Sequence, residues 1–199
     1  MRERVPPEGN RVKEGMNMEV EVKARLEDLE GIKKKLVAMG VVFNGSVTQK
    51  DKYFRKKGFE KRPQGPGDFI ARIRVAEGET TICTKTLTDV LGAWIENETE
   101  IKSPEEMEKI LLTFGFINVF NVNKSRESGS FRDFEVLLDD VKELGKFIEV
   151  SLISEEKEKT RERIISFLRE LGIPEDRIEK RGYGELISED MGCKFGGMR

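Results

Sequence analysis

The segment MEVEVKAR, residues 18–25, alternates charged and apolar side chains in the manner of a β-strand. In a strand, Glu19, Glu21 and Lys23 would lie on one face, and the valines between them on the other. This pattern is typical of a half-buried strand whose charged face meets water. The alternative is that the charges face a bound ligand, and the other strands decide between these two interpretations.

The same spacing recurs in most of the segments that have strand character. Charged residues stand two positions apart with apolar residues between them, so each strand would carry one charged face. In a single strand this favours a solvated surface with salt bridges. In a whole sheet it favours a curled sheet with its charges inside and its apolar face outside, under helices. The charged positions of the later strands are Arg72, Arg74, Lys85, Glu98, Glu100, Lys124, Arg126, Asp139 and Glu149.

Three segments have the period and the end signals of helices, namely residues 28–40, 103–115 and 155–172. Asp28 and Ser103 suit N-cap positions, and glycines follow the last turns. Residues 69–86 read as a hairpin, and residues 116–126 and 131–141 as two strands joined by the ESGS segment. The order of elements predicts an α+β fold with a closed eight-stranded antiparallel barrel, a tunnel with a polar interior, flanked by about three main helices.

Composition limits the classes of function. The chain has 199 residues, enough for about one domain, which we place at residues 17–187 between a flexible lead (1–16) and a tail (188–199). Charged residues make up 37%, but the net charge is only −2, which favours neither a nucleic-acid nor an acidic partner. No apolar run or leader indicates a membrane span or secretion, so we expect a cytoplasmic protein. Abundant Lys and Glu resemble a thermophile's surface.

The chain contains no histidine, which excludes Ser-His-Asp and Cys-His nucleophiles and His-ligated zinc. Its two cysteines, Cys83 and Cys193, have no metal-ligand spacing. Dense charges of both signs on one face suit a polyanion bound together with divalent cations. Lys and Arg bind phosphate oxygens, and carboxylates bind Mg²⁺ or Mn²⁺.

The segment EVEVK resembles the ExExK signature of the CYTH, or triphosphate tunnel metalloenzyme, superfamily. Further segments resemble, in the same order, its CyaB-like branch of class IV adenylyl cyclases. They are QKDKYF (49–54), DFIARIR (68–74), CTKT (83–86), ENETEI (96–101), KSR (124–126), LDDVKELGKFIEV (138–150) and GYGELI (182–187).

This resemblance implies an eight-stranded tunnel that binds a triphosphate with Mg²⁺ or Mn²⁺. It implies phosphate binding by Lys23, Arg72, Arg74, Lys85, Lys124 and Arg126. It implies metal binding by Glu19, Glu21, Asp139 and Glu149, with Glu98 and Glu100 in support. Glu19, Glu21 and Lys23 would form the catalytic motif.

One departure concerns the last long strand, where the family usually has two glutamates and this chain has Glu149 and Ser151. A hydroxyl is a weaker metal ligand than a carboxylate. The sequence therefore leaves open whether the protein keeps one of its metal positions and its full catalytic activity. Four functions remain: an adenylyl cyclase that forms cyclic AMP from ATP, a triphosphatase, a binding protein without turnover, and a structural protein with surface salt bridges. Whether the chain forms a homodimer is also open.

Overall fold

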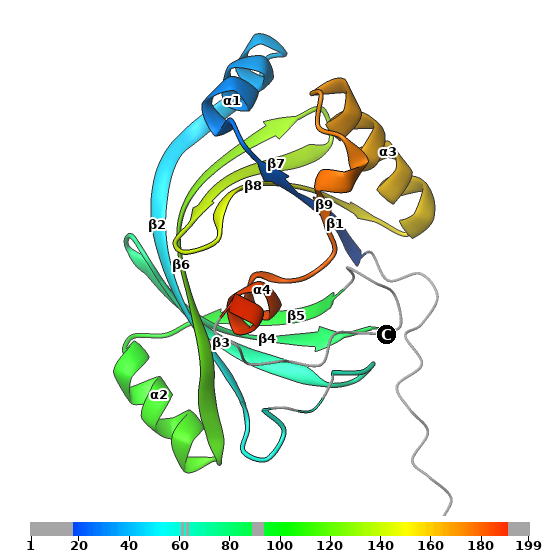
Figure 1. Ribbon diagram of the computed structural model, residues 1–199. Coiled ribbons are helices and arrows are strands. Elements are labelled where there is room, and N and C mark those ends of the chain that lie inside the picture. Colours follow the sequence, from blue (N-terminus) through cyan, green and yellow to red (C-terminus); the bar gives the residue numbers. More distant parts are fainter. Residues whose placement is uncertain (1–17, 61, 63, 89–93, 191–199) are drawn as a thin grey trace, which may run out of the picture.

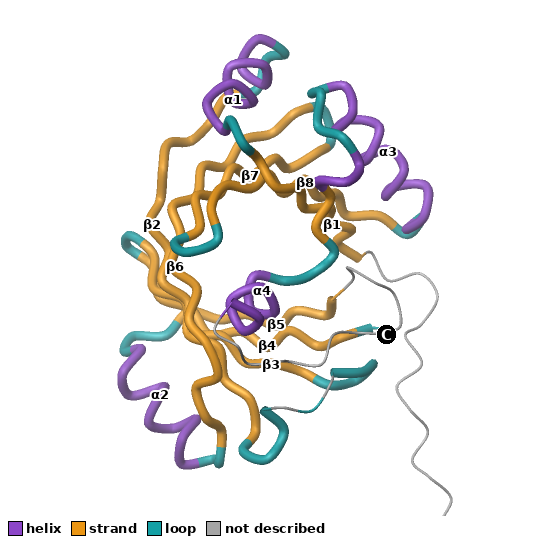
Figure 2. The backbone as a smooth tube through the Cα atoms, in the orientation of Figure 1, coloured by secondary structure: helices purple, strands orange, loops and turns teal. Residues whose placement is uncertain are grey.

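The computed structural model describes residues 18–60, 62, 64–88 and 94–190. These residues form one antiparallel sheet with the strand order β5-β4-β3-β2-β6-β7-β8-β1-β9 (Figures 1 and 2). The strands are β1 (Met18–Leu26), β2 (Val42–Lys56), β3 (Phe69–Ala76), β4 (Glu79–Leu87), β5 (Trp94–Glu100), β6 (Phe116–Phe131), β7 (Phe134–Val141), β8 (Gly145–Ser154) and β9 (Ile178–Glu179).

The sheet is strongly curled. The long strands β2 and β6 run its full width, with β1, β7 and β8 on one side of a central space and β3, β4 and β5 on the other (Figure 2). Within the described residues the sheet has nine strands and is open, because β1 and β5 approach each other without pairing. The predicted closure into an eight-stranded barrel is therefore not confirmed. A physical reason is that β9 pairs with residues 23–24 at the edge of β1 that closure would need.

In the described part of the chain, four α-helices accompany the sheet, namely α1 (Leu29–Ala38), α2 (Pro104–Thr113), α3 (Lys157–Glu170) and α4 (Tyr183–Asp190), with a short 3₁₀ turn at Glu175–Arg177. The first three confirm the helices predicted from sequence. The Asp28 side chain accepts a hydrogen bond from the Gly31 N–H at 2.8 Å, which satisfies a free donor at the start of α1. The Ser103 hydroxyl accepts one from the Glu106 N–H at 3.2 Å at the start of α2.

The largest core lies between the outer face of the sheet and helices α1 and α3. Val20 and Val22 of β1 are buried there with Leu36 of α1 and with Ile164 and Phe167 of α3. Each such side chain contributes roughly 1.5–3 kcal/mol by its removal from water. This confirms that the valines of the MEVEVKAR segment face outward beneath helices. The alternate residues of β1 must then face the central space.

The segment at residues 127–130 is not the turn that its composition suggested. It continues β6, and the turn comes later at Arg132 and Asp133, with Arg132 at φ 57°. Gly129 serves close packing inside the strand, because a Cβ there would lie 2.8 Å from Cγ1 of Val41. A glycine that permits a close approach has the same composition signal as a glycine in a turn.

Helix α4 was not predicted from the sequence; it begins in the segment GYGELI and lies between the two halves of the sheet (Figure 1). Helix α4 extends to Asp190, beyond the domain end predicted at residue 187, while the predicted lead at 1–16 lies outside the described residues. Among the helices that the structure describes, none has the length and hydropathy that crossing a membrane requires.

Candidate functional site

The inner face of the curled sheet encloses a cavity of about 580 Å³, with walls from strands β1 to β8 and from the start of α4. Asp139 is fully buried behind this wall, and Glu100 lies outside it, beside the turn between β3 and β4. The structure brings the other predicted residues together around the cavity. They are Glu19, Glu21, Lys23, Arg72, Arg74, Lys85, Glu98, Lys124, Arg126 and Glu149.

Lys23 on β1 links two carboxylates of the cavity wall. Its Nζ lies 2.9 Å from Oε1 of Glu149 and 3.2 Å from Oε1 of Glu21. Arg126 also contacts Glu149, so this buried carboxylate has two cationic partners. Burial alone would raise the pKa of Glu149, but Lys23 and Arg126 hold it well below its ordinary value. Glu149 is therefore ionised, and its neighbours already compensate its charge.

Asp139 on β7 fixes the two basic side chains that β6 contributes. Arg126 donates from Nε to Oδ1 of Asp139 at 2.6 Å, and the Nζ of Lys124 lies 3.1 Å from Oδ2. Burial and the nearby charge of Arg126 together lower the pKa of Lys124 to about 8. Asp139 accordingly acts as an anchor for these cations from a position that solvent does not reach.

On the opposite wall, each arginine of β3 is bound by carboxylates. Arg74 donates to both oxygens of Asp51, at 2.8 and 2.7 Å. The Nη2 of Arg72 donates to Glu96 at 2.9 Å and to Glu98 at 2.8 Å. These bonds restrict the rotamers of two long side chains, so less conformational entropy is lost when a ligand binds them.

Arg72 retains an unused donor. Only 5% of the residue is exposed, and its Nε has no hydrogen-bond partner among the described residues. A buried N–H without an acceptor is costly, by about 1–3 kcal/mol. Since Arg72 lines the cavity, an anion bound there could supply the missing acceptor.

Helix α4 contacts the basic wall of the cavity, formed by Lys23, Lys124 and Arg126, through Tyr183. The phenol donates to Oδ2 of Asp139 at 2.9 Å. The ammonium groups of Lys23 and Lys124 lie 4.4 and 5.1 Å from the centre of its ring, within cation–π range. Tyr183 thus contacts cations from β1 and β6 at once.

Helix α4 reaches this position because Gly184 packs closely against the ring of Phe120. A Cβ at Gly184 would lie only 2.0 Å from Cζ of that ring. Phe120 in turn stacks on Tyr53, with ring centres 4.7 Å apart. The glycine therefore permits the close approach of the helix to an aromatic pair that lines the cavity.

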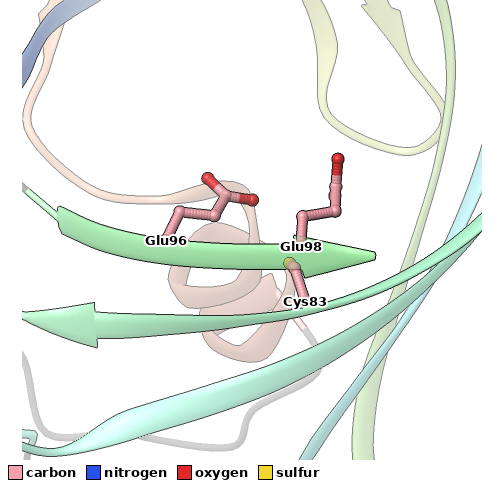
Figure 3. A group of neighbouring side chains, drawn as sticks. All are labelled: Cys83, Glu96 and Glu98. Carbon is pink, nitrogen blue, oxygen red and sulfur yellow. The ribbon is translucent and has the colours of Figure 1, made fainter. Parts of the chain in front are cut away.

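Cys83 on β4 lies beside Glu96 and Glu98 of β5, with one ligand atom of each within 4.8 Å of the others (Figure 3). The distances would suit a metal ion, but the surroundings do not. Arg72 binds both glutamates, and the Nζ of Lys85 lies 3.1 Å from Glu96. Burial raises the pKa of the Cys83 thiol to about 12, so it is not a ready thiolate ligand. We interpret the group as part of the ion-paired wall.

A row of side chains crosses three neighbouring strands on the other side of the cavity. Glu21 of β1 stands opposite Ser151 of β8, and Ser151 stands opposite Glu135 of β7. The Ser151 hydroxyl donates to Oε2 of Glu135 at 3.5 Å. Glu135 also lines the cavity, and it was not among the site residues predicted from the sequence. The alternation along β7 could have identified it, because it lies four residues before Asp139 and so on the same face.

The chain is similar to a known domain family and to a curated protein. The CYTH domain family matches residues 17–183. A curated protein of Methanocaldococcus jannaschii, "Putative adenylate cyclase MJ0240", is 31% identical over 174 residues, which covers 85% of this chain and 98% of that protein.

Solved structures share the fold. The PH1012 protein of Pyrococcus horikoshii is 28% identical, with a TM-score of 0.74 over 85% of this chain and 99% of that one. The Hippeastrum protein HpAC1, described as an adenylyl cyclase candidate with a dominant triphosphatase activity, is 16% identical, with a TM-score of 0.62 over 89% and 96% of the two chains. From the family match and the 31% identical relative together, we conclude that this chain belongs to the CYTH domain family.

Proposed function

We propose that the protein is a divalent-metal-dependent enzyme that acts on a triphosphate compound in this cavity. The observation that carries the proposal is the gathering of basic side chains from β1, β3, β4 and β6 on one concave surface. Phosphate oxygens are the preferred partners of such clusters. The basic residues are Lys23, Arg72, Arg74, Lys85, Lys124 and Arg126.

The carboxylates divide into two groups. Asp139, Glu149 and Glu98 are bound to Lys or Arg, and we assign them to the positioning of these cations. Glu19 and Glu21 line the cavity, and Glu21 contacts Lys23 through Oε1. We assign these two to metal binding, because hard divalent cations such as Mg²⁺ and Mn²⁺ prefer oxygen ligands. A bound cation would supply charge neutralisation to the phosphates. Because Glu100 lies outside the cavity, we assign it no role in the site.

The first candidate reaction is the formation of cyclic AMP. The ribose 3′-hydroxyl of ATP attacks the α-phosphorus, and pyrophosphate leaves. The name of the Methanocaldococcus jannaschii relative favours this reaction. Its main requirements are in-line positioning and compensation of phosphate charge, which the paired cations supply without a histidine base.

The second candidate reaction is the hydrolysis of a triphosphate, such as tripolyphosphate, thiamine triphosphate or a nucleotide, by attack of water on the terminal phosphorus. The description of the Hippeastrum protein favours this reaction on the same fold. The basic side chains would serve either reaction, because they contact phosphates and not the organic part of the substrate.

Product analysis distinguishes these reactions. The purified protein is incubated with ATP or with tripolyphosphate, together with Mg²⁺ or Mn²⁺, and the products are separated. Cyclic AMP and pyrophosphate from ATP would identify a cyclase, and orthophosphate without cyclic AMP would identify a triphosphatase. Tight binding without turnover would leave a binding protein. Absence of both binding and turnover for both compounds would contradict the proposal.

A further inference from the structure

We propose that Glu135 is a metal ligand of this site and acts with Glu19 and Glu21 to bind a divalent cation beside Ser151. This inference rests on the proposed function, since the cation would accompany the bound triphosphate. Glu135 lies outside the segments that resemble the family motifs.

The strand register places these side chains in one row across three strands. Ser151 pairs with Glu21 on one side and with Glu135 on the other, so three adjacent strands present one row to the cavity. Side chains directly opposite in antiparallel strands have Cβ atoms about 4.5–5.5 Å apart. Ser151 is 4% exposed, and its hydroxyl donates to Glu135. Glu19 lies two residues from Glu21 on the same face of β1 and also lines the cavity.

The protein compensates the charges of this row only in part, through Lys23, whose Nζ lies 3.2 Å from Oε1 of Glu21. Among the described residues, Glu19 and Glu135 have no cationic side chain within ion-pair distance, whereas Glu149 has both Lys23 and Arg126. Carboxylates gathered on one face repel each other, and a shared cation would stabilise them.

The unused donor of Arg72 is an independent indication of a ligand in the same cavity. The side chain is buried, it lines the cavity, and its Nε has no partner among the described residues. This donor lacks an acceptor, which a phosphate oxygen would supply, while Glu19 and Glu135 across the cavity have no cationic partner within ion-pair distance among the described residues. An anionic phosphate chain with a divalent cation satisfies both, and Mg²⁺ commonly binds through one or two carboxylates plus substrate phosphates.

The direct test measures binding of Mn²⁺ alone by electron paramagnetic resonance, which requires no turnover. We expect Glu135→Gln to weaken Mn²⁺ binding by at least about tenfold, and Glu19→Gln to do the same. Glu135 is exposed at the cavity, so the isosteric change should not affect folding. Asp140→Asn is the matched control, because Asp140 is exposed on the opposite face of the same strand and should leave the affinity unchanged.

A second variant tests whether a carboxylate at a neighbouring position can restore Mn²⁺ binding. In Glu135→Gln combined with Ser151→Glu, the carboxylate moves to the facing position on β8, and we expect most of the lost Mn²⁺ affinity to return. Unchanged affinity in Glu135→Gln would overturn the inference, as would failure of the double variant to bind better than Glu135→Gln.

Failure of the inference can be told apart from failure of the proposed function by titration of wild type with tripolyphosphate. If wild type binds tripolyphosphate and Mn²⁺ while Glu135→Gln equals it, only the role of Glu135 is wrong. If wild type binds tripolyphosphate but not Mn²⁺, the inference is likewise wrong. If wild type does not bind tripolyphosphate, the proposed function itself fails.

Discussion

At the scale of single residues, Asp139 is the anchor of the basic wall. It is fully buried and accepts hydrogen bonds from Lys124, Arg126 and Tyr183. We expect Asp139→Asn to lower the free energy of unfolding by about 3–5 kcal/mol, because it leaves the buried ammonium of Lys124 without its counter-charge. Urea unfolding followed by circular dichroism measures this change.

The same variant separates a positioning role from a metal-binding role. A positioning residue should affect stability and triphosphate affinity together. If Asp139→Asn kept wild-type stability and lost only Mn²⁺ affinity, Asp139 would instead be a metal ligand, as the family resemblance implied.

A substitution at Tyr183 tests the same group of contacts around Asp139 while leaving the ion pairs of Asp139 intact. Tyr183→Phe removes one hydrogen bond to Asp139 but keeps the ring beside Lys23 and Lys124. We expect a loss of about 1 kcal/mol in stability and a several-fold rise in KM with little change in kcat. Tyr183→Leu, which also removes the ring, should raise KM further. Equal kinetics for the two variants would contradict a role for the cation–π contacts.

The alternation of charged and apolar residues along each strand predicted which side chains face the cavity, because successive side chains of a strand point to opposite faces of the sheet. It could not predict their partners, since partners depend on register. Sequence alone gave no reason to pair Arg72 with Glu96 or Arg74 with Asp51. Likewise, the position of Ser151 between Glu21 and Glu135 requires the pairing of three strands.

At the scale of elements, the docking of α4 depends on one glycine. A Cβ at Gly184 would lie 2.0 Å from the Phe120 ring, so Gly184→Ala should displace the helix. Alanine favours an isolated helix by about 1 kcal/mol, so any loss must come from the clash. We expect faster amide hydrogen exchange in residues 183–187 and weaker triphosphate binding.

The control for this prediction is Gly182→Ala. A Cβ at Gly182 would meet no atom within 4 Å, and its backbone can still donate to Glu185. Exchange in α4 should remain at the wild-type level in this variant. If Gly182→Ala and Gly184→Ala accelerated exchange equally, the contact with Phe120 would not be what holds the helix.

Glu179 of β9 forms ion pairs with Arg25 and Arg181 that are sensitive to acid. These pairs hold in place the segment that leads into α4. Glu179 lies 3.3 Å from Nε of Arg25 and 2.8 Å from Nη2 of Arg181. Burial alone would raise the pKa of Glu179, but the bonds from Arg181 and the charge of Arg25 lower it to about 2. Because the folded-state pKa lies below the ordinary 4.5, this stabilisation is present above about pH 4.5 and is lost as pH falls toward 2.

We therefore expect Glu179→Gln to be less stable than wild type by about 1–2 kcal/mol at pH 7, allowing for solvent screening of the pair. The difference should shrink steadily between pH 4.5 and pH 3. Urea unfolding of both proteins across this range measures it. A difference that stayed constant with pH would show that the charge of Glu179 is not the cause.

The predicted elements were most accurate where local signals were strong. The capped helices α1 and α2 and the hairpin β3–β4 have such signals. The sequence did not reveal α4, which begins at a glycine-rich segment, or β9, which is two residues long and forms only against β1. Both depend on tertiary contacts that no local pattern encodes.

At the scale of the whole molecule, the curl of the sheet separates its apolar face from its charged face. Its apolar face is covered by α1, α2 and α3, while its inner face carries cations and carboxylates at high density. Each of the proposed phosphate-binding side chains is held by at least one carboxylate. The cavity is therefore nearly neutral overall, yet its cations are positioned in advance for a polyanion.

The most direct test of this account is a calorimetric titration of wild type, Arg72→Ala and Lys142→Ala with tripolyphosphate in the presence of Mn²⁺. Lys142 is exposed in the turn after β7, outside the cavity, and serves as the control. We predict that Arg72→Ala binds about 10–100-fold more weakly, since it loses charged hydrogen bonds worth about 1.5–3 kcal/mol, while Lys142→Ala binds like wild type. Equal affinity of folded Arg72→Ala and wild type would contradict the assignment of this cavity as the triphosphate site.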